Sequence, residues 1–274
     1  MTMLLVLFGA VLALALWAWG GPVWREHRRR QQRRTPFPQA WRKMLQQRVP
    51  YLRRLPADLR LQLQGHIQVF LAEKAFIGCR GLVITDEMKL VIAAQACLLL
   101  LNQPRPAYFP GMRQVLVYPA AFRVDRHHTD EAGVVTQEQQ VLSGESWSQG
   151  QVILSWHDVV EDAAVPGDGY NVVVHEFAHQ LDQEDGEANG APPLRHKADY
   201  ARWSKVMHGA FSALQAQVER GEDTLLGDYA ATEPAEFFAV ASEVFFELPD
   251  RLLEAHADLY RELARYYRID PLSW

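Results

Sequence analysis

Cysteine is nearly absent from this sequence of 274 residues, because only Cys79 and Cys97 occur. Two cysteines are too few for a disulfide framework of the kind that small secreted proteins use, so a reducing compartment is the simplest interpretation. Both lie among apolar residues, and we interpret them as buried small side chains rather than reactive thiols. Internal repeats and low-complexity tracts are also absent, and nothing in the composition argues for bulk disorder.

Basic residues are scarce after residue 34. The chain has 28 Lys and Arg against 33 Asp and Glu, and six of the arginines lie before residue 35 with one acid, Glu26. Without these six arginines and Glu26, the rest of the chain has 22 basic and 32 acidic residues, a formal charge of −10. Phosphate binding normally needs a basic face, so this acidity argues against nucleic acid as a partner.

Charged side chains are missing from the N-terminal stretch Met3–Trp24, which is apolar and rich in tryptophan near its end. About 20 apolar residues cross a bilayer, so residues 1–24 are predicted to form a transmembrane anchor. Residues 25–36, a basic juxtamembrane linker, would hold the rest of the chain on the cytoplasmic side of the inner membrane. A cleaved signal peptide and a buried or peripheral N-terminal helix are the alternatives to an anchor.

The remaining residues, 37–274, are predicted to form one α+β domain that begins after the two prolines of “TPFP” (35–38). Hydrophobic residues make up 49% of the chain, which is ample for a packed core. Helices are predicted over residues 39–74, with a break near Pro50–Pro56, over Asp86–Leu101, and through most of the C-terminal half. Strands are predicted at “GLVIT” (81–85), 114–124, 136–146 and 151–156.

The stretch “NVVVHEFAHQLDQEDG” (171–186) carries the pattern with the clearest chemistry. Residues four apart lie on one face of a helix, so His175 and His179 can bind the same cation. Glu176 would then face the open position of the metal, where a zinc hydrolase places its general base. Asn171 or Asp168 is expected to cap this helix, and Gly186 to end it.

A third ligand is required, because a helix can carry this short pattern by chance. The arrangement in which a glycine and a third histidine follow closely fails here, since Asp182 and Asp185 occupy those positions. A more distant histidine, His196 or His208, is an alternative, although both lie in polar surroundings.

The stronger candidate for the third ligand is Glu236, in “EPAEFFAVASEVFFELP” (233–249). Pro234 and Pro249 bound an apolar helix on which Glu236 and Glu243 share a face. A carboxylate on a buried helix is costly unless it is paired or binds a cation. The alternative is that Glu236 is a salt-bridged residue or a residue of the first helical turn, where the helix dipole favours an acid. Glu243 is either a hydrogen-bond acceptor for a ligand histidine or a solvated residue.

Taken together, HEFAH, the following “DGEANGAPPL” and “YAATEPAEFFAV” resemble the Mlc titration factor A family of bacterial zinc peptidases. The catalytic region of that family is similar to that of anthrax lethal factor. Upstream stretches such as “WRKMLQQRVPYLRRLP” and “VLVYPAAF” extend the resemblance over roughly residues 35 to 260.

This resemblance implies a zincin-like domain with flanking helices and one Zn²⁺ per chain. The metal ligands would be His175, His179 and Glu236, the general base would be Glu176, and the hydroxyl of Tyr229 would point at the metal. The family resembles aminopeptidases in activity and is known for binding the glucose repressor Mlc, which links it to sugar uptake. Its members are described as soluble and cytosolic, so the apolar N-terminus is a departure, and a soluble cytoplasmic chain is the alternative localisation.

The predicted activity is hydrolysis of a peptide or protein substrate by water that Glu176 activates. In zincins the substrate pairs with an edge strand, for which residues 144–156 are the candidate. Asp182 and Glu184 are candidates for contacting a substrate amino terminus, although acids just past a helix are usually solvated. The competing interpretation is a non-catalytic protein that binds a repressor of the Mlc type. The glutamate at 176 favours the enzyme, because structural zinc sites need no base.

Overall fold

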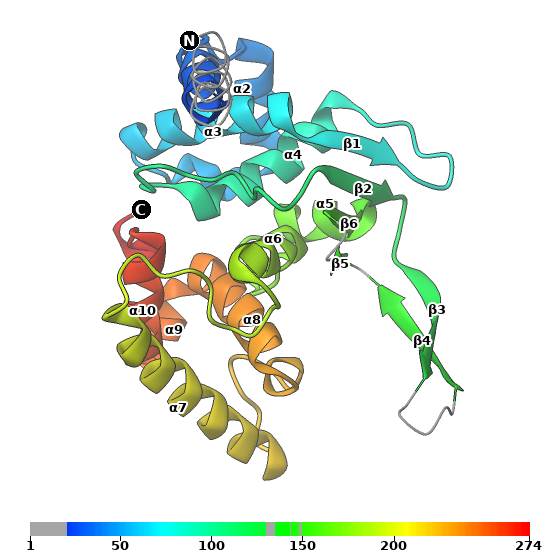
Figure 1. The fold of residues 1–274 in the computed structure, drawn as a ribbon, viewed down its shortest axis with the longest axis vertical. Coiled ribbons are helices and arrows are strands. Elements are labelled where there is room, and N and C mark those ends of the chain that lie inside the picture. Colours follow the sequence, from blue (N-terminus) through cyan, green and yellow to red (C-terminus); the bar gives the residue numbers. More distant parts are fainter. Residues whose placement is uncertain (1–20, 130–134, 143, 148–149) are drawn as a thin grey trace, which may run out of the picture.

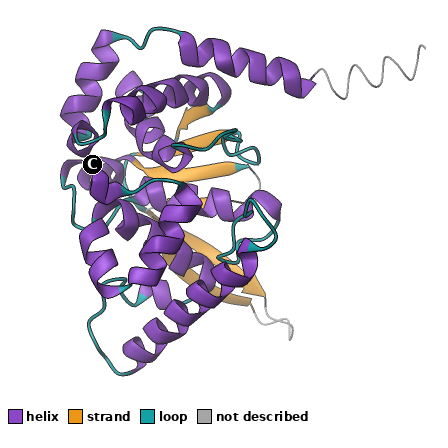
Figure 2. Cartoon of the chain, turned by 90° about the vertical axis from the view of Figure 1, so that its left-hand side faces the viewer, coloured by secondary structure: helices purple, strands orange, loops and turns teal. Residues whose placement is uncertain are grey.

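The computed structural model describes residues 21–129, 135–142, 144–147 and 150–274, and side chains are described outside 122–149. Helices surround a small sheet, and α6 (Val172–Asp182), which carries HEFAH, lies between the sheet and the C-terminal helices (Figures 1 and 2). The N-terminal half contains α2 (Gln39–Arg48), α3 (Ala57–Glu73) and α4 (Asp86–Ala96). The C-terminal half contains α5 (Trp156–Ala164), α7 (Asp199–Glu219), α8 (Pro234–Glu247), α9 (Pro249–Ala255) and α10 (Ala257–Tyr267). Short 3₁₀ helices occupy Pro50–Arg53, Cys97–Leu100, Gln183–Asp185, Tyr229–Ala231 and Pro271–Ser273.

The sheet has the strand order β1-β2-β6-β5 among the described residues. Its strands are β1 (Ala75–Gly78), β2 (Gln114–Tyr118), β6 (Gln151–Ser155) and β5 (Gly144–Trp147). The first three are parallel, and β5 pairs antiparallel with β6 at the edge next to α6. A separate antiparallel ribbon, β3 (Phe122–Thr129) and β4 (Val135–Leu142), extends away from this sheet (Figure 1). This mixture of helices with a small sheet agrees with the predicted α+β class.

Most of the predicted elements are confirmed. The helices over 39–74 break at Pro50–Arg53, the helix from Asp86 continues as a 3₁₀ turn to Leu100, and β2 and β6 fall where strands are predicted. The predicted strand over 136–146 corresponds to β4 and β5, with residue 143 outside the described residues.

The strand predicted at residues 81–85 is wrong. The strand of this region is β1, which lies earlier in the chain, and residues 81–85 form a turn and a connector instead. Arg80 and Gly81 have φ values of 51° and 80°, a left-handed conformation that interrupts extended chain. Thr85 then accepts the N–H of Met88 and caps α4, so the end of “GLVIT” serves the helix.

Aromatic side chains join the two halves of the molecule across the HEFAH helix. Phe177 of α6 is buried with its ring centroid 4.8 Å from that of Phe109 and 5.6 Å from that of Phe70 on α3. Contacts of this kind are favourable beyond the area they bury. The face of α6 opposite the histidines is therefore anchored in the core, and this anchoring fixes the direction in which the histidines point.

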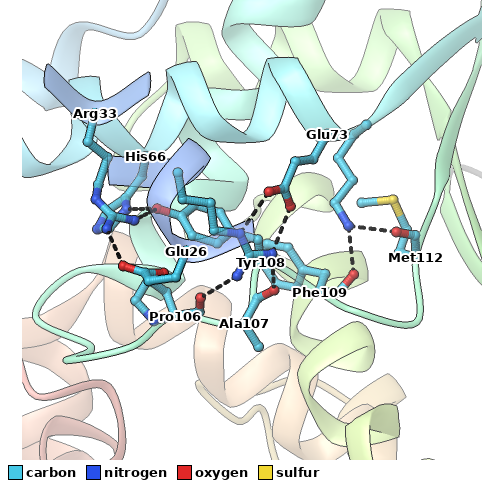
Figure 3. Close-up of polar contacts among 11 residues, drawn as sticks. Glu26, Arg33, His66, Glu73, Pro106, Ala107, Tyr108, Phe109 and Met112 are labelled. Atoms are coloured by element: carbon cyan, nitrogen blue, oxygen red, sulfur yellow. Dashed lines mark hydrogen bonds and ion pairs between the residues drawn. The ribbon is translucent and has the colours of Figure 1, made fainter. Parts of the chain in front are cut away.

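The basic segment predicted as a juxtamembrane linker lies in a helix over residues 21–34 that packs on α3; we call it the N-terminal helix. The Arg29 guanidinium donates to both carboxylate oxygens of Glu73 at 2.7 Å and to the carbonyl of Ala107 at 3.0 Å. Arg33 donates to the hydroxyl of Tyr108, which also bonds His66 Nδ1 at 2.7 Å (Figure 3). The division of the chain into anchor, linker and domain stays a prediction, but Arg29 and Arg33 form hydrogen bonds with residues 37–274, the body of the protein.

The predicted transmembrane anchor, residues 1–24, falls largely on residues 1–20, which lie outside the described residues. Within the part of the chain that the structure describes, no helix has the length and apolar character needed to span a bilayer.

Candidate metal site

The helix α6 begins where its sequence predicts. Asn171 caps it by accepting the N–H of Val174 at 3.0 Å, and the valines that follow are apolar and largely buried. A carboxylate oxygen of Asp162 accepts the N–H of Val172 at 2.7 Å, which satisfies another free donor of the first turn. His175 and His179 then lie one turn apart on the face that points toward α8, with their ring centroids 4.8 Å apart.

Three ligand atoms converge on one point. The Nε2 atoms of His175 and His179 are 3.2 Å apart, and Glu236 Oε2 lies 3.0 Å from the first and 3.4 Å from the second. Zinc–nitrogen and zinc–oxygen bonds of about 2.0–2.1 Å in a tetrahedron place ligand atoms about 3.3 Å apart. The spacing of the three atoms therefore fits one tetrahedrally coordinated cation.

The state of the glutamate oxygen supports the same conclusion. Glu236 Oε2 is buried and makes no hydrogen bond within the described residues, although two ring nitrogens are close to it. Burial alone would raise the pKa of Glu236, but the two histidines outweigh it and hold that pKa below its usual value. An ionised, buried oxygen that faces two imidazole nitrogens fits a metal ligand, and the donor set of two imidazoles and one carboxylate fits zinc. Glu236 is thus brought to the site that the sequence predicts for it.

Glu243 lies behind His175, which settles the alternative that the sequence leaves open. The Nδ1–H of His175 donates to Glu243 Oε1 at 2.8 Å, and this bond turns Nε2 toward Glu236. Burial would lower the pKa of His175, but the charges of Glu243 and Glu236 raise it well above its usual value. A carboxylate in this position fixes the tautomer and orientation of a ligand histidine.

The same helix, α8, also holds the start of α6. Glu243 Oε2 accepts the backbone N–H of Asn171 at 2.6 Å, and Glu247 Oε1 accepts the side-chain amide of Asn171 at 3.0 Å. Glu247 Oε2 accepts the N–H of Gly167 at 2.9 Å. The two carboxylates thereby fix α6 relative to α8, and with it the distance between the histidines and Glu236. The sequence did not identify Glu247 as a residue that supports the site, because its position on α8 does not show which groups face it.

Glu176 is 4% exposed and has one carboxylate oxygen without a hydrogen-bond partner in the described residues. Burial raises the pKa of Glu176 to about 7, and the nearby histidines act against this rise. The residue lines a cleft with a volume of about 860 Å³ that also reaches His175 and Tyr229. It is therefore next to the three ligand atoms without being one of them.

Tyr229 lies at the same cleft, in the 3₁₀ turn that precedes α8. Its ring is stacked on that of His175 at a centroid distance of 6.1 Å, and 54% of the side chain is exposed. Partial burial raises the pKa of its hydroxyl, and the charge of Glu236 adds to the rise, so the hydroxyl stays protonated at neutral pH. The structure thus brings Tyr229 to the site.

The other candidates do not join this group. His196 and His208 are exposed and are not part of the ligand cluster of the described residues. Asp182 is buried and accepts the N–H of Gly190 at 2.7 Å, so it holds the loop after α6. Glu184 lines a different cleft. A second cluster of ligand-type side chains, His157, Asp158 and Glu161, lies at the exposed start of α5.

The fold and the site together define a class of protein: a mixed helix and sheet domain whose HExxH helix faces a distant glutamate, the ligand set of metal hydrolases. Residues 23–268 match the family model of the glucose-regulated metallo-peptidase M90, and the chain belongs to this family.

Similar curated proteins support this membership. The uncharacterized protein slr2042 of Synechocystis is 42% identical over 263 residues, which cover 96% of this chain and 95% of that protein. Mlc titration factor A of Pectobacterium atrosepticum is 39% identical, with 82% of this chain and 84% of that protein covered. Mlc titration factor A of Klebsiella pneumoniae is 35% identical with the same coverage. The resemblance identified from the sequence motifs is confirmed.

Proposed function

We propose that this protein is a zinc-dependent peptidase with a zincin-like catalytic domain. The observation that carries the proposal is the convergence of His175 Nε2, His179 Nε2 and Glu236 Oε2 at tetrahedral spacing beside the buried carboxylate of Glu176. Zinc bound there would supply Lewis acidity and lower the pKa of a bound water. Membership in a metallopeptidase family supports the same activity.

The protein's own residues divide the remaining work. Glu176 takes a proton from the attacking water and passes it to the leaving amine. The hydroxyl of Tyr229 donates a hydrogen bond to the oxyanion that forms on the substrate carbonyl. Glu243 keeps His175 oriented through the Nδ1–H bond. An extended substrate lies along β5, the edge strand beside α6, in a direction that backbone pairing fixes. We assign the enzyme to the aminopeptidase-like type on the resemblance alone.

The metal assignment is tested by measuring zinc per chain in the purified full-length protein and in His179→Ala and Glu236→Ala variants. We expect about one zinc in the parent, in keeping with a single site, and a clear loss in both variants. His208→Ala, which removes an exposed histidine, is the matched control and should retain the metal. A parent without tightly held metal would refute the assignment.

The enzymatic assignment is tested separately with Glu176→Gln. This substitution keeps the shape of the side chain and removes the base, so hydrolysis of peptide substrates should be abolished while zinc is retained. Turnover that survives the substitution would refute the role of Glu176.

Repressor binding is the second candidate function, and the names of the relatives favour it. In this alternative the protein sequesters a repressor of the Mlc type without needing hydrolysis. Binding that survives Glu176→Gln, measured by co-purification with such a repressor, would separate the two roles, which can also coexist.

For localisation, the proposal keeps the apolar stretch Met3–Trp24 as a single-pass inner-membrane anchor with the catalytic domain in the cytoplasm. A soluble cytoplasmic protein is the alternative. A phosphatase reporter fused after Trp274 should stay inactive, because such reporters need the periplasm, and an active fusion would refute the orientation.

A further inference from the structure

A basic cleft opens where the N-terminal helix meets the body of the protein. It has a volume of about 380 Å³ and lies between the first turns of that helix, the end of α3 and the segment before β2. Five cationic side chains and one anionic side chain line it, namely Arg25, Arg28, Arg29, Lys74, Arg113 and Glu73. Among the described residues that line it, Glu73 is the only acid, and the cleft shares no lining residue with the cleft of the candidate metal site.

Two of the cations have partners in the fold. Arg29 is paired with Glu73, so the charges of these two side chains cancel (Figure 3). Lys74 donates from a buried position to the carbonyls of Phe109 at 2.7 Å and Met112 at 2.6 Å. Burial lowers the pKa of Lys74 to about 8 although the charge of Glu73 acts against this fall, so the ammonium keeps most of its charge at neutral pH.

The other three cations, Arg25, Arg28 and Arg113, are exposed, and no ion pair is recorded for them within the described residues. Two come from the N-terminal helix and one comes from the body, so the cleft exists only because that helix is docked. The chain as a whole has a formal charge of −5. Three arginines around one hollow on an acidic protein, none of them in an ion pair with another described residue, indicate an anionic ligand that several guanidinium groups can contact together.

The apolar surroundings indicate where that anion is found. Trp24 is 60% exposed and Val23 is 71% exposed at the same end of the N-terminal helix. The Arg28 guanidinium lies 5.0 Å from the centroid of the Trp24 ring, which keeps a cation beside an exposed aromatic. The sequence that precedes them is free of charged side chains back to Met3. Exposed tryptophan next to arginine is the combination that proteins place at the level of lipid headgroups.

We propose that this cleft binds the phosphate of an anionic phospholipid, with Arg25, Arg28 and Arg113 as its contacts and Trp24 at the headgroup level. The body of the protein then rests against an anionic membrane surface through a built site, because Arg113 acts together with the two helix arginines. The inference shares the membrane setting of the localisation proposal and is independent of the peptidase proposal.

The test compares the partitioning of the full-length protein onto phosphatidylcholine vesicles with and without phosphatidylglycerol. An arginine near an anionic surface contributes about fivefold to such partitioning, so the parent should prefer the anionic vesicles by on the order of 100-fold. The triple variant Arg25→Gln, Arg28→Gln, Arg113→Gln should lose this preference. A matched variant, Arg195→Gln, Arg220→Gln, Arg261→Gln, has the same net charge and should keep it. Anchoring by the apolar stretch acts on both vesicle types, so its presence or absence does not alter the ratio.

Arg113→Gln alone is the decisive variant. It should lower the preference about fivefold, whereas Arg105→Gln, an exposed arginine that lines a different cleft, should not change it. An unchanged preference in Arg113→Gln would overturn the proposal. It would show that Arg25 and Arg28 attract anionic lipid by their position next to the membrane segment alone, and that the cleft does not bind the phosphate. Equal binding of the parent to both vesicle types would also overturn it. The lipid proposal would also be overturned if inorganic phosphate stabilised the parent but not Arg113→Gln and the parent showed no lipid preference. The ligand would then be a soluble phosphate compound.

Discussion

The imidazole of His175 lies between two carboxylates, Glu236 on the side of the ligand cluster and Glu243 behind the ring. Because a carboxylate only accepts hydrogen bonds, Glu243 keeps the proton on Nδ1 and leaves Nε2 free for a cation. The orientation of the ring therefore depends on a residue that does not touch the metal position.

Glu243→Gln should lower zinc affinity by about 10-fold to 100-fold, because the ring loses a charged acceptor that orients it and raises its basicity. Zinc titration against a competing chelator measures the effect. Glu254→Gln, an exposed substitution of the same kind on α9, is the control and should bind zinc as the parent does. Equal affinity of the Glu243 variant would contradict this role.

His66 provides a pH-dependent prediction away from the site. It is buried against the hydroxyl of Tyr108, and burial together with the charge of Arg33 lowers the pKa of its imidazole to about 4. The unfolded chain binds a proton near pH 6.5 and the folded protein does not, so the free energy of unfolding should fall as the pH drops from about 6.5 to 4.

Urea unfolding at several pH values tests this dependence. In His66→Gln the free energy of unfolding should fall less steeply with decreasing pH, by up to about the slope that one bound proton contributes. The exposed His208→Gln should leave this slope unchanged. A slope in His66→Gln that equals that of the parent would refute the assignment.

The residues of the site were predictable from the sequence because their chemistry is rare in its context. Two histidines one turn apart form a metal-binding pattern, and a glutamate on an apolar helix is costly to bury unless it is paired or binds a cation. The role of Glu243 was not decidable, since spacing along α8 places it on a face but does not show what faces it.

At the scale of elements, α6 and α8 act as one unit. Asn171 caps α6 and is itself held by Glu243 and Glu247 of α8, so the start of one helix is bonded to the side chains of the other. The geometry of the ligand cluster follows from this connection, because the histidines and Glu236 lie on the two helices that it joins.

Asn171→Ala should lower the free energy of unfolding by about 1–3 kcal/mol, because α6 loses its cap and Glu247 loses a donor. Zinc affinity should fall as well, since the start of α6 is no longer fixed to α8. Thr85→Ala, which removes the cap of α4, should cost about 1 kcal/mol and leave zinc affinity unchanged. Urea unfolding and zinc titration of both variants separate a general loss of stability from a loss of positioning.

Long elements rich in apolar residues, such as α3, α4 and α8, were predictable from the sequence, but β1 was not. Its four residues, “AFIG”, lie at the edge of the sheet and follow α3 directly, so they give a weaker signal than the apolar “GLVIT” that follows. The left-handed turn at Arg80 and Gly81, which separates the two, has one glycine as its only sequence signal.

At the scale of the whole molecule, the basic N-terminal helix is part of the fold. Arg29 reaches Glu73 of α3 and the carbonyls of Pro106 and Ala107, with only 12% of its side chain exposed. The sequence indicated a run of arginines suited to membrane orientation, and it could not show that two of them face inward, because the contacts join residues far apart in the chain.

Arg29→Gln should lower the free energy of unfolding by about 1–3 kcal/mol, since Glu73 and two carbonyls lose their donors. Arg30→Gln on the same helix, where 68% of the side chain is exposed, should cost less than about 0.5 kcal/mol. Thermal or urea unfolding of the full-length variants distinguishes the two. Equal stability would mean that the N-terminal helix does not contribute to the fold.

The ligand atoms also come from distant parts of the chain, since residues 180–235 separate His179 from Glu236 and include the whole of α7. A cation bound by both would act as a cross-link that closes this long segment into a ring, so the metal would restrict the unfolded chain as well as serve the chemistry. Chelation should therefore increase protease cleavage within this segment before it affects α3 or α4, which limited proteolysis followed by mass spectrometry can measure. Cleavage at the same rate with and without chelator would show that the helices hold the segment closed without help from the metal.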